Sequence, residues 1–311
     1  MLLKVKLQLS IVMYILLITG WAYAGTITVN STGDTDSRDT IITLREAIML
    51  SEGDLAYGDL TPDEQAQVIP PVGNGIADTI DFSFSGTITL TSNLPTVTDS
   101  GTVVDASSRW NGIWPGGQPG ITIDGNGAVG RGFEIVGTSN CQILGLFITN
   151  CQFNGVYIAD GSQFNAVGGT VSGNRNVISG NGESGVRIDA LGTDNNVVKG
   201  NYIGTNVTGN ADLGNTLFGV NIEGGPQSNT IGGTTAGERN IISGNDGRGV
   251  FIGGSGTNSN VVIGNFIGTD VTGTAALGNG DRGVTIIGGG QWQTNRGTTA
   301  GEREIISGKW K

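Results

Sequence analysis

The chain of 311 residues contains no histidine, two cysteines and 16 lysine and arginine residues against 27 aspartate and glutamate residues. Without histidine, a Ser-His-Asp triad, a histidine general base and most zinc sites are excluded. The net charge of −11 argues against nucleic acid or an anionic membrane surface as a partner. Any chemistry must therefore come from carboxylates, amides and a few arginines.

Long apolar runs are also scarce, and the first of them is short. Two lysines precede a largely apolar stretch from Leu7 to Leu17, and Ala22-Tyr23-Ala24 follows. This arrangement predicts a secretory signal peptide over residues 1–24, with the mature chain starting at Gly25. An uncleaved anchor is the alternative, but the stretch is shorter than the roughly 20 residues of a spanning helix. We therefore expect a secreted or cell-surface protein with no membrane span after signal cleavage.

The two cysteines, Cys141 and Cys151, allow a single disulfide, which an exported protein can form. One pair cannot be the main covalent support of a chain this long. We interpret both cysteines as small residues packed in or beside turns.

What the chain does have is an internal repeat of 64 residues. The segment Asn176–Asn181 returns at Asn240–Asn245, and Gly200–Thr205 returns at Gly264–Thr269. A glycine-threonine pair recurs with the same offset at residues 169, 233 and 297. A period held this strictly indicates stacked structural units, here from about residue 165.

A shorter pattern divides each repeat into two coils. The word Gly-Val-x-Ile starts at residues 155, 185, 219, 249 and 283, with spacings of 30, 34, 30 and 34 residues. Every coil carries three short segments rich in β-branched residues and bounded by glycine or asparagine, which predicts three strands per coil. The sequence therefore predicts an all-β protein, a single-stranded parallel β-helix with three sheets.

Alternation of side chains places the valine and isoleucine of each Gly-Val-x-Ile word inward. The predicted outward column is Tyr157, Arg187, Asn221, Phe251 and Thr285. Asparagines at the corners should stack from coil to coil and bond to the coils above and below. One predicted stack is Asn165, Asn196, Asn229 and Asn260, and the other is Asn176, Asn201, Asn240 and Asn265. The coils swell alternately at Thr234–Arg239 and at Asn206–Phe218 or Asp270–Arg282, and we interpret these bulges as packing elements.

Before the repeats, Thr43-Leu44-Arg45-Glu46 has the spacing of a capping box and predicts a short helix. A helix at this place would cover the first open coil. The opening strand Ile27–Asn30 and the motif Leu44–Ala47 resemble the CSLREA domain of exported bacterial β-helix proteins, with Ile42 where that family has its cysteine. We assign residues 25–60 to this cap and residues 61–311 to the β-helix.

The repeats, with Ile231–Asn240 as the clearest copy, are similar to those of right-handed β-helix proteins of the pectin-lyase-like fold class. This resemblance implies a right-handed coil. It also implies that carboxylates and arginines would be the groups available for a polysaccharide lyase or hydrolase. Hydrolysis needs two carboxylates facing one bond, and a lyase needs a base near a cation.

Two sets of acidic residues are candidates for cation binding, with calcium as the expected ion. Asp189 and Glu223 each follow a Gly-Val-x-Ile word and should stack about 4.8 Å apart. The second set lies in a Ser/Thr/Gly-rich loop and comprises Asp34, Asp36 and Asp39. The competing interpretation of the first set is a solvated acidic edge. That of the second set is an ordinary exposed loop.

Candidates for glycan contact are Trp110 and Trp114, in a proline- and glycine-rich insertion, and the outward Tyr157 and Arg187. Exposed aromatic rings stack on sugars, whereas rings tucked against the solenoid would only cover its core. No catalytic set emerges. We therefore expect a non-catalytic exported scaffold that is adhesive or contacts an extracellular polysaccharide or cell-surface glycan; the alternative is a polysaccharide lyase or glycoside hydrolase.

The third copy of the repeat departs from the pattern. Asn295 and Arg296 replace an isoleucine and a glycine of the preceding copy, and Glu304 and Lys309 replace asparagines. We expect a frayed last coil or self-association through it, because an uncapped coil exposes strand edges and core. A truncated gene is the alternative explanation.

Overall fold

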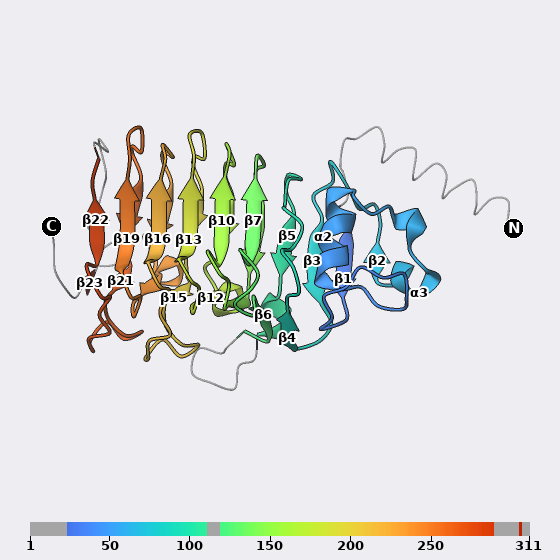
Figure 1. Ribbon diagram of the computed structural model, residues 1–311, viewed down its shortest axis with the longest axis horizontal. Coiled ribbons are helices and arrows are strands. Elements are labelled where there is room, and N and C mark those ends of the chain that lie inside the picture. The colour runs from blue at the N-terminus through green and yellow to red at the C-terminus, as the bar shows by residue number, and fades with distance from the viewer. Residues whose placement is uncertain (1–23, 111–118, 289–304, 307–311) are drawn as a thin grey trace, which may run out of the picture.

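The computed structural model of the protein describes residues 24–110, 119–288 and 305–306. In these residues the chain winds through three parallel sheets, coil after coil, along one axis (Figure 1). The prediction of an all-β parallel β-helix is confirmed. The departures from the repeat at Asn295, Arg296, Glu304 and Lys309 lie outside the described residues.

From β5 to β22 each coil contributes one strand to each sheet, and at the N-terminal edge of sheet A strand β2 pairs antiparallel with β1. Sheet A is built, in spatial order, from β2 (Val68–Ile69), β1 (Thr26–Val29), β3 (Thr79–Phe82), β5 (Val103–Asp105), β8 (Gln142–Leu144), β11 (Ala166–Val167), β14 (Val197–Val198), β17 (Thr230–Gly232) and β20 (Val261–Ile263). Sheet B is built from β4 (Gly86–Thr89), β6 (Ile121–Asp124), β9 (Leu146–Thr149), β12 (Val177–Ile178), β15 (Tyr202–Ile203), β18 (Ile241–Ile242), β21 (Phe266–Ile267) and β23 (Ile305–Ile306). Sheet C is built from β7 (Phe133–Val136), β10 (Val156–Ala159), β13 (Ser184–Asp189), β16 (Phe218–Glu223), β19 (Arg248–Gly253) and β22 (Val284–Ile286).

The core is a column of aliphatic side chains that the strict register of the strands stacks in layers. In sheet C the valines of the Gly-Val-x-Ile words pair in series from Val156 to Val284, and all of them are buried. The isoleucines two residues later form the next layer, from Ile158 to Ile286, and the residue between them points outward. Burial of one such side chain contributes on the order of 1.5–3 kcal/mol, so each added coil extends a continuous core.

Asparagine ladders hold the corners of the coils together, as expected. Asn165 donates through its backbone N–H and its side-chain Nδ2 to Oδ1 of Asn196, each at 3.0 Å. Asn196 repeats both bonds to Asn229, and Asn229 repeats them to Asn260. The second predicted stack bonds in the same way from coil to coil. A third ladder, which the sequence analysis missed, consists of Asn181, Asn215, Asn245 and Asn279.

The two cysteines occupy ladder positions one coil before the asparagines begin. The backbone N–H of Cys141 donates to Oδ1 of Asn165, and that of Cys151 donates to Oδ1 of Asn181. Both thiols are free and buried. They are therefore packed small residues beside the corners of the coils, as interpreted from the sequence, and they form no disulfide.

The repeated bulges cover a second apolar cluster on the outer side of sheet B. Val207 and Val271, from the two long bulges, pack against the outward side chains of this sheet. These are Val177, Tyr202, Ile241 and Phe266. Arg175 and Arg239 complete the cover, with the guanidinium carbon 4.2 Å from the ring centroids of Tyr202 and Phe266 respectively. The bulges therefore have the packing role that their repetition predicts.

Helix α2 (Leu44–Glu52) closes the N-terminal end of the solenoid on the side of sheet C (Figure 1). Its capping box forms as predicted: the Thr43 hydroxyl accepts from the N–H of Glu46, whose carboxylate accepts from the N–H of Thr43. Its apolar side chains join the core that Ile27 and Val29 begin. Strand β1 pairs with β3, so the cap and the coils share one sheet.

The remaining helical elements are short. They are α3 (Pro62–Gln65) and the 3₁₀ turns Tyr57–Asp59, Ser107–Arg109, Ser172–Asn174 and Ala236–Glu238. In the parts of the chain that the structure covers, no helix has the length and apolar character needed to traverse a bilayer.

We predict that Asn196→Ala lowers the free energy of unfolding by roughly 2–4 kcal/mol, because it removes the side-chain bonds to both neighbouring coils and leaves the buried Ser162 carbonyl and Asn165 N–H without their partner. The Asn196 side chain bonds to Ser162 O, to Asn229 and to Asn165. Urea denaturation followed by circular dichroism measures the change. Asn74→Ala, at an exposed asparagine, is the control and should change the free energy by less than about 0.5 kcal/mol. Equal effects of the two substitutions would contradict a stabilising ladder.

Candidate functional site

A polar depression of about 240 Å³ lies on the outer face of sheet C. Strands β10 and β13 form its floor, and the residues before β7, β10 and β13 form its rim. The lining residues are Arg131, Phe153, Asn154, Tyr157, Glu183, Arg187 and Asp189. Three of them, Tyr157, Arg187 and Asp189, are candidates from the sequence, and they form one site.

The parallel register explains why these three side chains meet. Tyr157 on β10 is the direct partner of Arg187 on β13, and Asp189 lies two residues further along the same strand. Side chains two residues apart in a strand share a face. Because the valine and isoleucine beside Arg187 are buried, the intervening positions must face outward. The shared face is therefore fixed by the core.

Ion pairs and hydrogen bonds organise the floor of the depression. Arg187 donates to Oδ2 of Asp189 through Nη2 at 2.8 Å and through Nε at 3.2 Å. The Tyr157 hydroxyl donates to the same oxygen at 3.4 Å, and the N–H of Ala190 donates to Oδ1 at 2.8 Å. Both carboxylate oxygens of Asp189 are therefore engaged within the protein.

Arg131 lies over the Tyr157 ring, with its guanidinium carbon 3.7 Å from the ring centroid, and it pairs with Glu134. This contact is a cation–π interaction. Burial raises the pKa of the Tyr157 phenol above its usual value of 10.0, the charge of Asp189 adds to the effect, and Arg131 and Arg187 oppose it. Tyr157 is therefore a neutral phenol at physiological pH, suited to donating a hydrogen bond.

The depression does not continue along the outward column beyond Arg187. Asn221, Phe251 and Thr285 follow Arg187 in register as predicted, but all three are buried. Phe251 stacks on Phe218, with ring centroids 5.1 Å apart, so these two rings cover part of the face. Glu223 is the register partner of Asp189 but does not line the depression.

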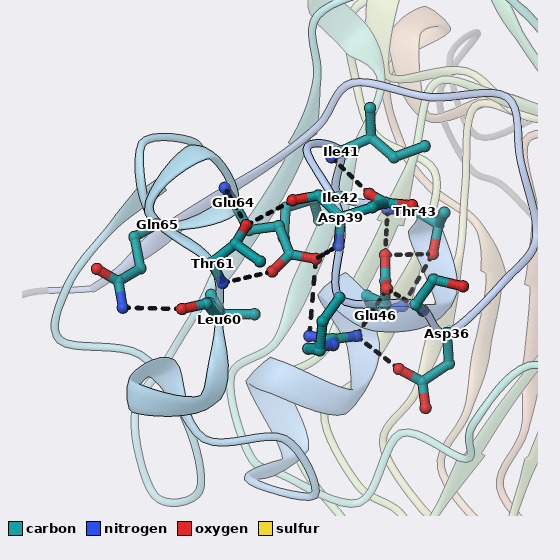
Figure 2. Close-up of polar contacts among 12 residues, drawn as sticks. Asp36, Asp39, Ile41, Ile42, Thr43, Glu46, Leu60, Thr61, Glu64 and Gln65 are labelled. Atoms are coloured by element: carbon teal, nitrogen blue, oxygen red, sulfur yellow. Dashed lines mark hydrogen bonds and ion pairs between the residues drawn. The ribbon is translucent and has the colours of Figure 1, made fainter.

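The acidic loop before α2 is committed to local hydrogen bonds and ion pairs. Asp34 is buried and accepts from Arg45 at 2.9 Å and from the N–H of Thr91 at 2.6 Å. Asp36 pairs with Arg38 at 2.6 Å, and Oδ1 of Asp39 accepts from the N–H of Ile41 at 2.8 Å (Figure 2).

The guanidinium of Arg38 also pairs with Glu46, at 2.7 Å, and lies 3.9 Å from Glu64. These two glutamates belong to the capping boxes of α2 and α3 (Figure 2). The loop thus ties the two helix starts together. The described residues contain no group of three or more acidic or cysteine ligands that could hold a metal ion. The structure gives no support to the calcium expected from Asp34, Asp36 and Asp39 or from Asp189 and Glu223.

Of the two tryptophan candidates, only Trp110 lies in the described residues, and it does not line the depression. Trp110 is half-buried at the end of a 3₁₀ turn, with the guanidinium of Arg175 5.9 Å from its ring centroid. This position fits a ring that covers the solenoid. Trp114 lies outside the described residues.

Sequence reasoning missed Arg131, Phe153, Asn154 and Glu183. The strand after Arg131 belongs to the same face, but its word is Gly-Phe-Glu-Ile, with phenylalanine in the place of valine. It begins at residue 132, only 23 residues before the next word, so it breaks both the motif and the spacing. A broader motif, with any large apolar residue in the place of valine, would have identified this strand and Arg131 beside it.

Comparison with known proteins gives one family. Residues 27–219, more than half of the chain, match the family model described as periplasmic copper-binding protein (NosD). The search of curated proteins finds no match.

The residues of this chain do not fit a copper site of the usual kind. Copper prefers imidazole, thiolate and thioether ligands. Histidine is absent and methionine occurs three times, with only Met49 outside the predicted signal peptide. Cys141 precedes a strand of sheet A and Cys151 follows one of sheet B. Burial raises the pKa of both thiols, that of Cys151 to about 12, so both are protonated at neutral pH.

We predict that the protein retains no stoichiometric copper after incubation with Cu(II), or with Cu(I) under reducing conditions, followed by desalting. Metal analysis by mass spectrometry measures the retained copper. The Cys141→Ser/Cys151→Ser double variant should give the same low value. One equivalent of copper that survives desalting in the wild-type protein and is lost in the double variant would contradict this prediction.

The described fold and the family match agree with each other. The matched segment begins in β1 and extends to the start of β16, so it includes the N-terminal cap, the first coils and all the residues that line the depression. The family is a periplasmic one, and export was expected from the first residues of the sequence. The chain belongs to the NosD family of exported β-helix proteins.

Proposed function

We propose that this protein is a non-catalytic exported scaffold that contacts glycan through the depression on sheet C. The observation that carries the proposal is the composition of this depression. It combines an exposed aromatic side chain, Phe153, with guanidinium, carboxylate, amide and phenol groups directed at the same space. Phe153 is 42% exposed, and it is the exposed large apolar side chain that lines the depression.

The charges of the depression favour a neutral sugar. Arg131 is paired with Glu134 and Arg187 with Asp189, so no cation is left to neutralise a uronate. Hydroxyl groups can both donate and accept, and they would match a surface that offers carboxylate acceptors beside guanidinium donors. Phe153 at the rim offers an apolar face to a sugar ring.

The size of the depression favours contact with a single ring of a longer polymer. Pockets that enclose small molecules have about 300–1,000 Å³. The depression measures about 240 Å³ and opens to solvent, so it would hold one sugar residue while the polymer runs along the face. A scaffold or adhesive role needs no deeper enclosure.

The same geometry argues against the alternative of a polysaccharide lyase or hydrolase at this place. Both oxygens of Asp189 already accept hydrogen bonds, and its charge is paired. Tyr157, with a raised pKa, is a poor base at neutral pH. Binding without turnover is the function that these contacts support.

We also propose that α2 and β1 form a CSLREA-like cap. Leu44–Ala47 opens the helix, and its Arg45 bonds to the carbonyl groups of Ser92 and Asn93 and to Asp34. This arginine thus ties the motif to the loop before α2 and to the first coil. A role for the motif in covering the open end explains its position ahead of the repeats.

We predict that the mature protein binds a neutral oligosaccharide on a glycan array and that Phe153→Ala weakens this binding at least tenfold. Arg187→Gln should act in the same direction, because hydrogen bonds to charged groups are worth about 1.5–3 kcal/mol. Titration calorimetry at low and high salt measures the affinity. A neutral ligand predicts little dependence on salt.

Arg248→Gln is the matched control, since Arg248 lies on the same sheet and is also paired with an aspartate, Asp281, outside the depression. It should leave the affinity unchanged. Binding only of polyuronates, with steep salt dependence, would contradict the neutral ligand. Release of reducing ends or unsaturated products from any polymer would contradict a non-catalytic scaffold.

A further inference from the structure

The first residue of the predicted mature chain, Gly25, is buried beside a buried carboxylate. The carbonyl of Gly25 accepts from the N–H of Thr79 at 2.9 Å, which continues the pairing of β1 with β3 and sets Gly25 next to Asp78. A Cβ at residue 25 would lie 2.2 Å from the Pro71 carbonyl oxygen and 2.8 Å from Oδ1 of Asp78. The chain therefore approaches Asp78 so closely that only glycine fits.

Among the residues that the structure describes, Asp78 has no charged partner. The residue is 0% exposed, and its Oδ1 makes no hydrogen bond of normal geometry. Oδ2 accepts from the N–H of Gly73 at 2.8 Å. Burial raises the pKa of Asp78 from 3.8 to about 6, while the N–H groups of Gly73 and Gly25 act in the opposite direction.

Two more carboxylates face Asp78 and increase the cost of its charge. Glu52, at the end of α2, and Asp99 are both buried, and each repels a charge on Asp78. Glu52 accepts three hydrogen bonds through Oε2, from Thr98 and Asp99, but its buried Oε1 has no partner. Within the described residues, none of these three carboxylates takes part in an ion pair. The described residues therefore offer no positive charge that compensates these three carboxylates.

Signal cleavage would supply that charge at this place. Ala24 is exposed and Gly25 is buried, so the bond after Ala22-Tyr23-Ala24 lies at the mouth of the cluster. A signal peptidase adds water across the Ala24–Gly25 peptide bond, which leaves a carboxylate on Ala24 and an amine on Gly25. The amine then takes a proton from solvent and becomes an α-ammonium.

We propose that the α-ammonium of Gly25, released by signal cleavage, forms a buried ion pair with Asp78 and thereby stabilises the N-terminal cap only after export. The cluster in which this ion pair would form consists of Gly25, Asp78, Glu52 and Asp99. Removal of the leader thus changes the electrostatics of the cap as well as the length of the chain.

The pH dependence follows from the two titrating partners. In the uncleaved chain the raised pKa of Asp78 means that stability is lost as the pH rises from 3.8 to about 6. In the cleaved chain the ammonium holds the carboxylate in its charged form, so this loss is removed. The stability gained by cleavage is therefore absent near pH 4, grows up to about pH 6, and is full up to about pH 8, where a free α-amine loses its proton.

The test uses a chain in which a soluble peptide replaces residues 1–23 and a site-specific protease cuts before Gly25. Thermal unfolding is measured on the same preparation before and after cleavage. At pH 7 cleavage should raise the midpoint by roughly 5 °C or more, and at pH 4 it should leave the midpoint nearly unchanged. A gain of equal size at both pH values would overturn the proposal.

Asp78→Asn keeps the shape of the side chain and removes its charge, so it should abolish the gain at pH 7. Asp63→Asn, at an exposed carboxylate of α3, is the matched control and should preserve the gain. An undiminished gain in Asp78→Asn would overturn the ion pair.

A measurement that needs no variant is the acylation rate of the α-amine. In the folded, cleaved protein at pH 7 this amine should react at least tenfold more slowly than in the unfolded chain, because it is buried and paired. Equal rates, or a mature N-terminus other than Gly25 in mass spectra of the exported protein, would overturn the proposal.

Discussion

At the corners of the coils from Cys141 onward, buried backbone N–H groups have no strand partner, and stacked asparagine amides satisfy them. An inner ladder asparagine such as Asn196 accepts from the asparagine of the preceding coil, and its Nδ2 donates to a carbonyl of that coil and to the asparagine of the next, so that one side chain joins three coils. A buried amide without these partners would cost about 1–3 kcal/mol for each unpaired group. This requirement fixes the register between coils, and the register in turn stacks the valine and isoleucine layers of the core. The outward column, including Tyr157 and Arg187, inherits its alignment from the same constraint.

The same register explains how far sequence reasoning could go. The spacing of the Gly-Val-x-Ile words predicts the pairing of Tyr157 with Arg187 and the outward position of Asp189, because strand alternation and a constant coil length suffice for both. Arg131 and Phe153 were not predictable in this way, since they lie in turns of shorter coils where the period fails. The burial of Asn221 and Phe251 also escaped prediction. Phe251 stacks on Phe218 of the neighbouring strand, and such a contact between strands cannot be read from the pattern of a single strand.

Membership in the NosD family and the chemistry of this chain do not coincide in every respect. The family is described as copper-binding, yet this sequence lacks histidine, and its two thiols sit in the ladder positions of separate corners. A thiol donates and accepts hydrogen bonds only weakly, so each cysteine marks the place where an amide ladder starts. The β-helix can thus be retained while the groups on its surface change, because the core and the corners are satisfied without them.

The direction of the ladders has a mechanical consequence. Strands run around the solenoid, whereas the bonds between them and between the asparagine amides run along its axis. A pull along the axis therefore loads one interface between coils at a time, and the coils would separate one after another. A pull across the axis instead loads many strand bonds together in shear. A protein of this kind anchored by its side would resist far more force than one anchored by its ends.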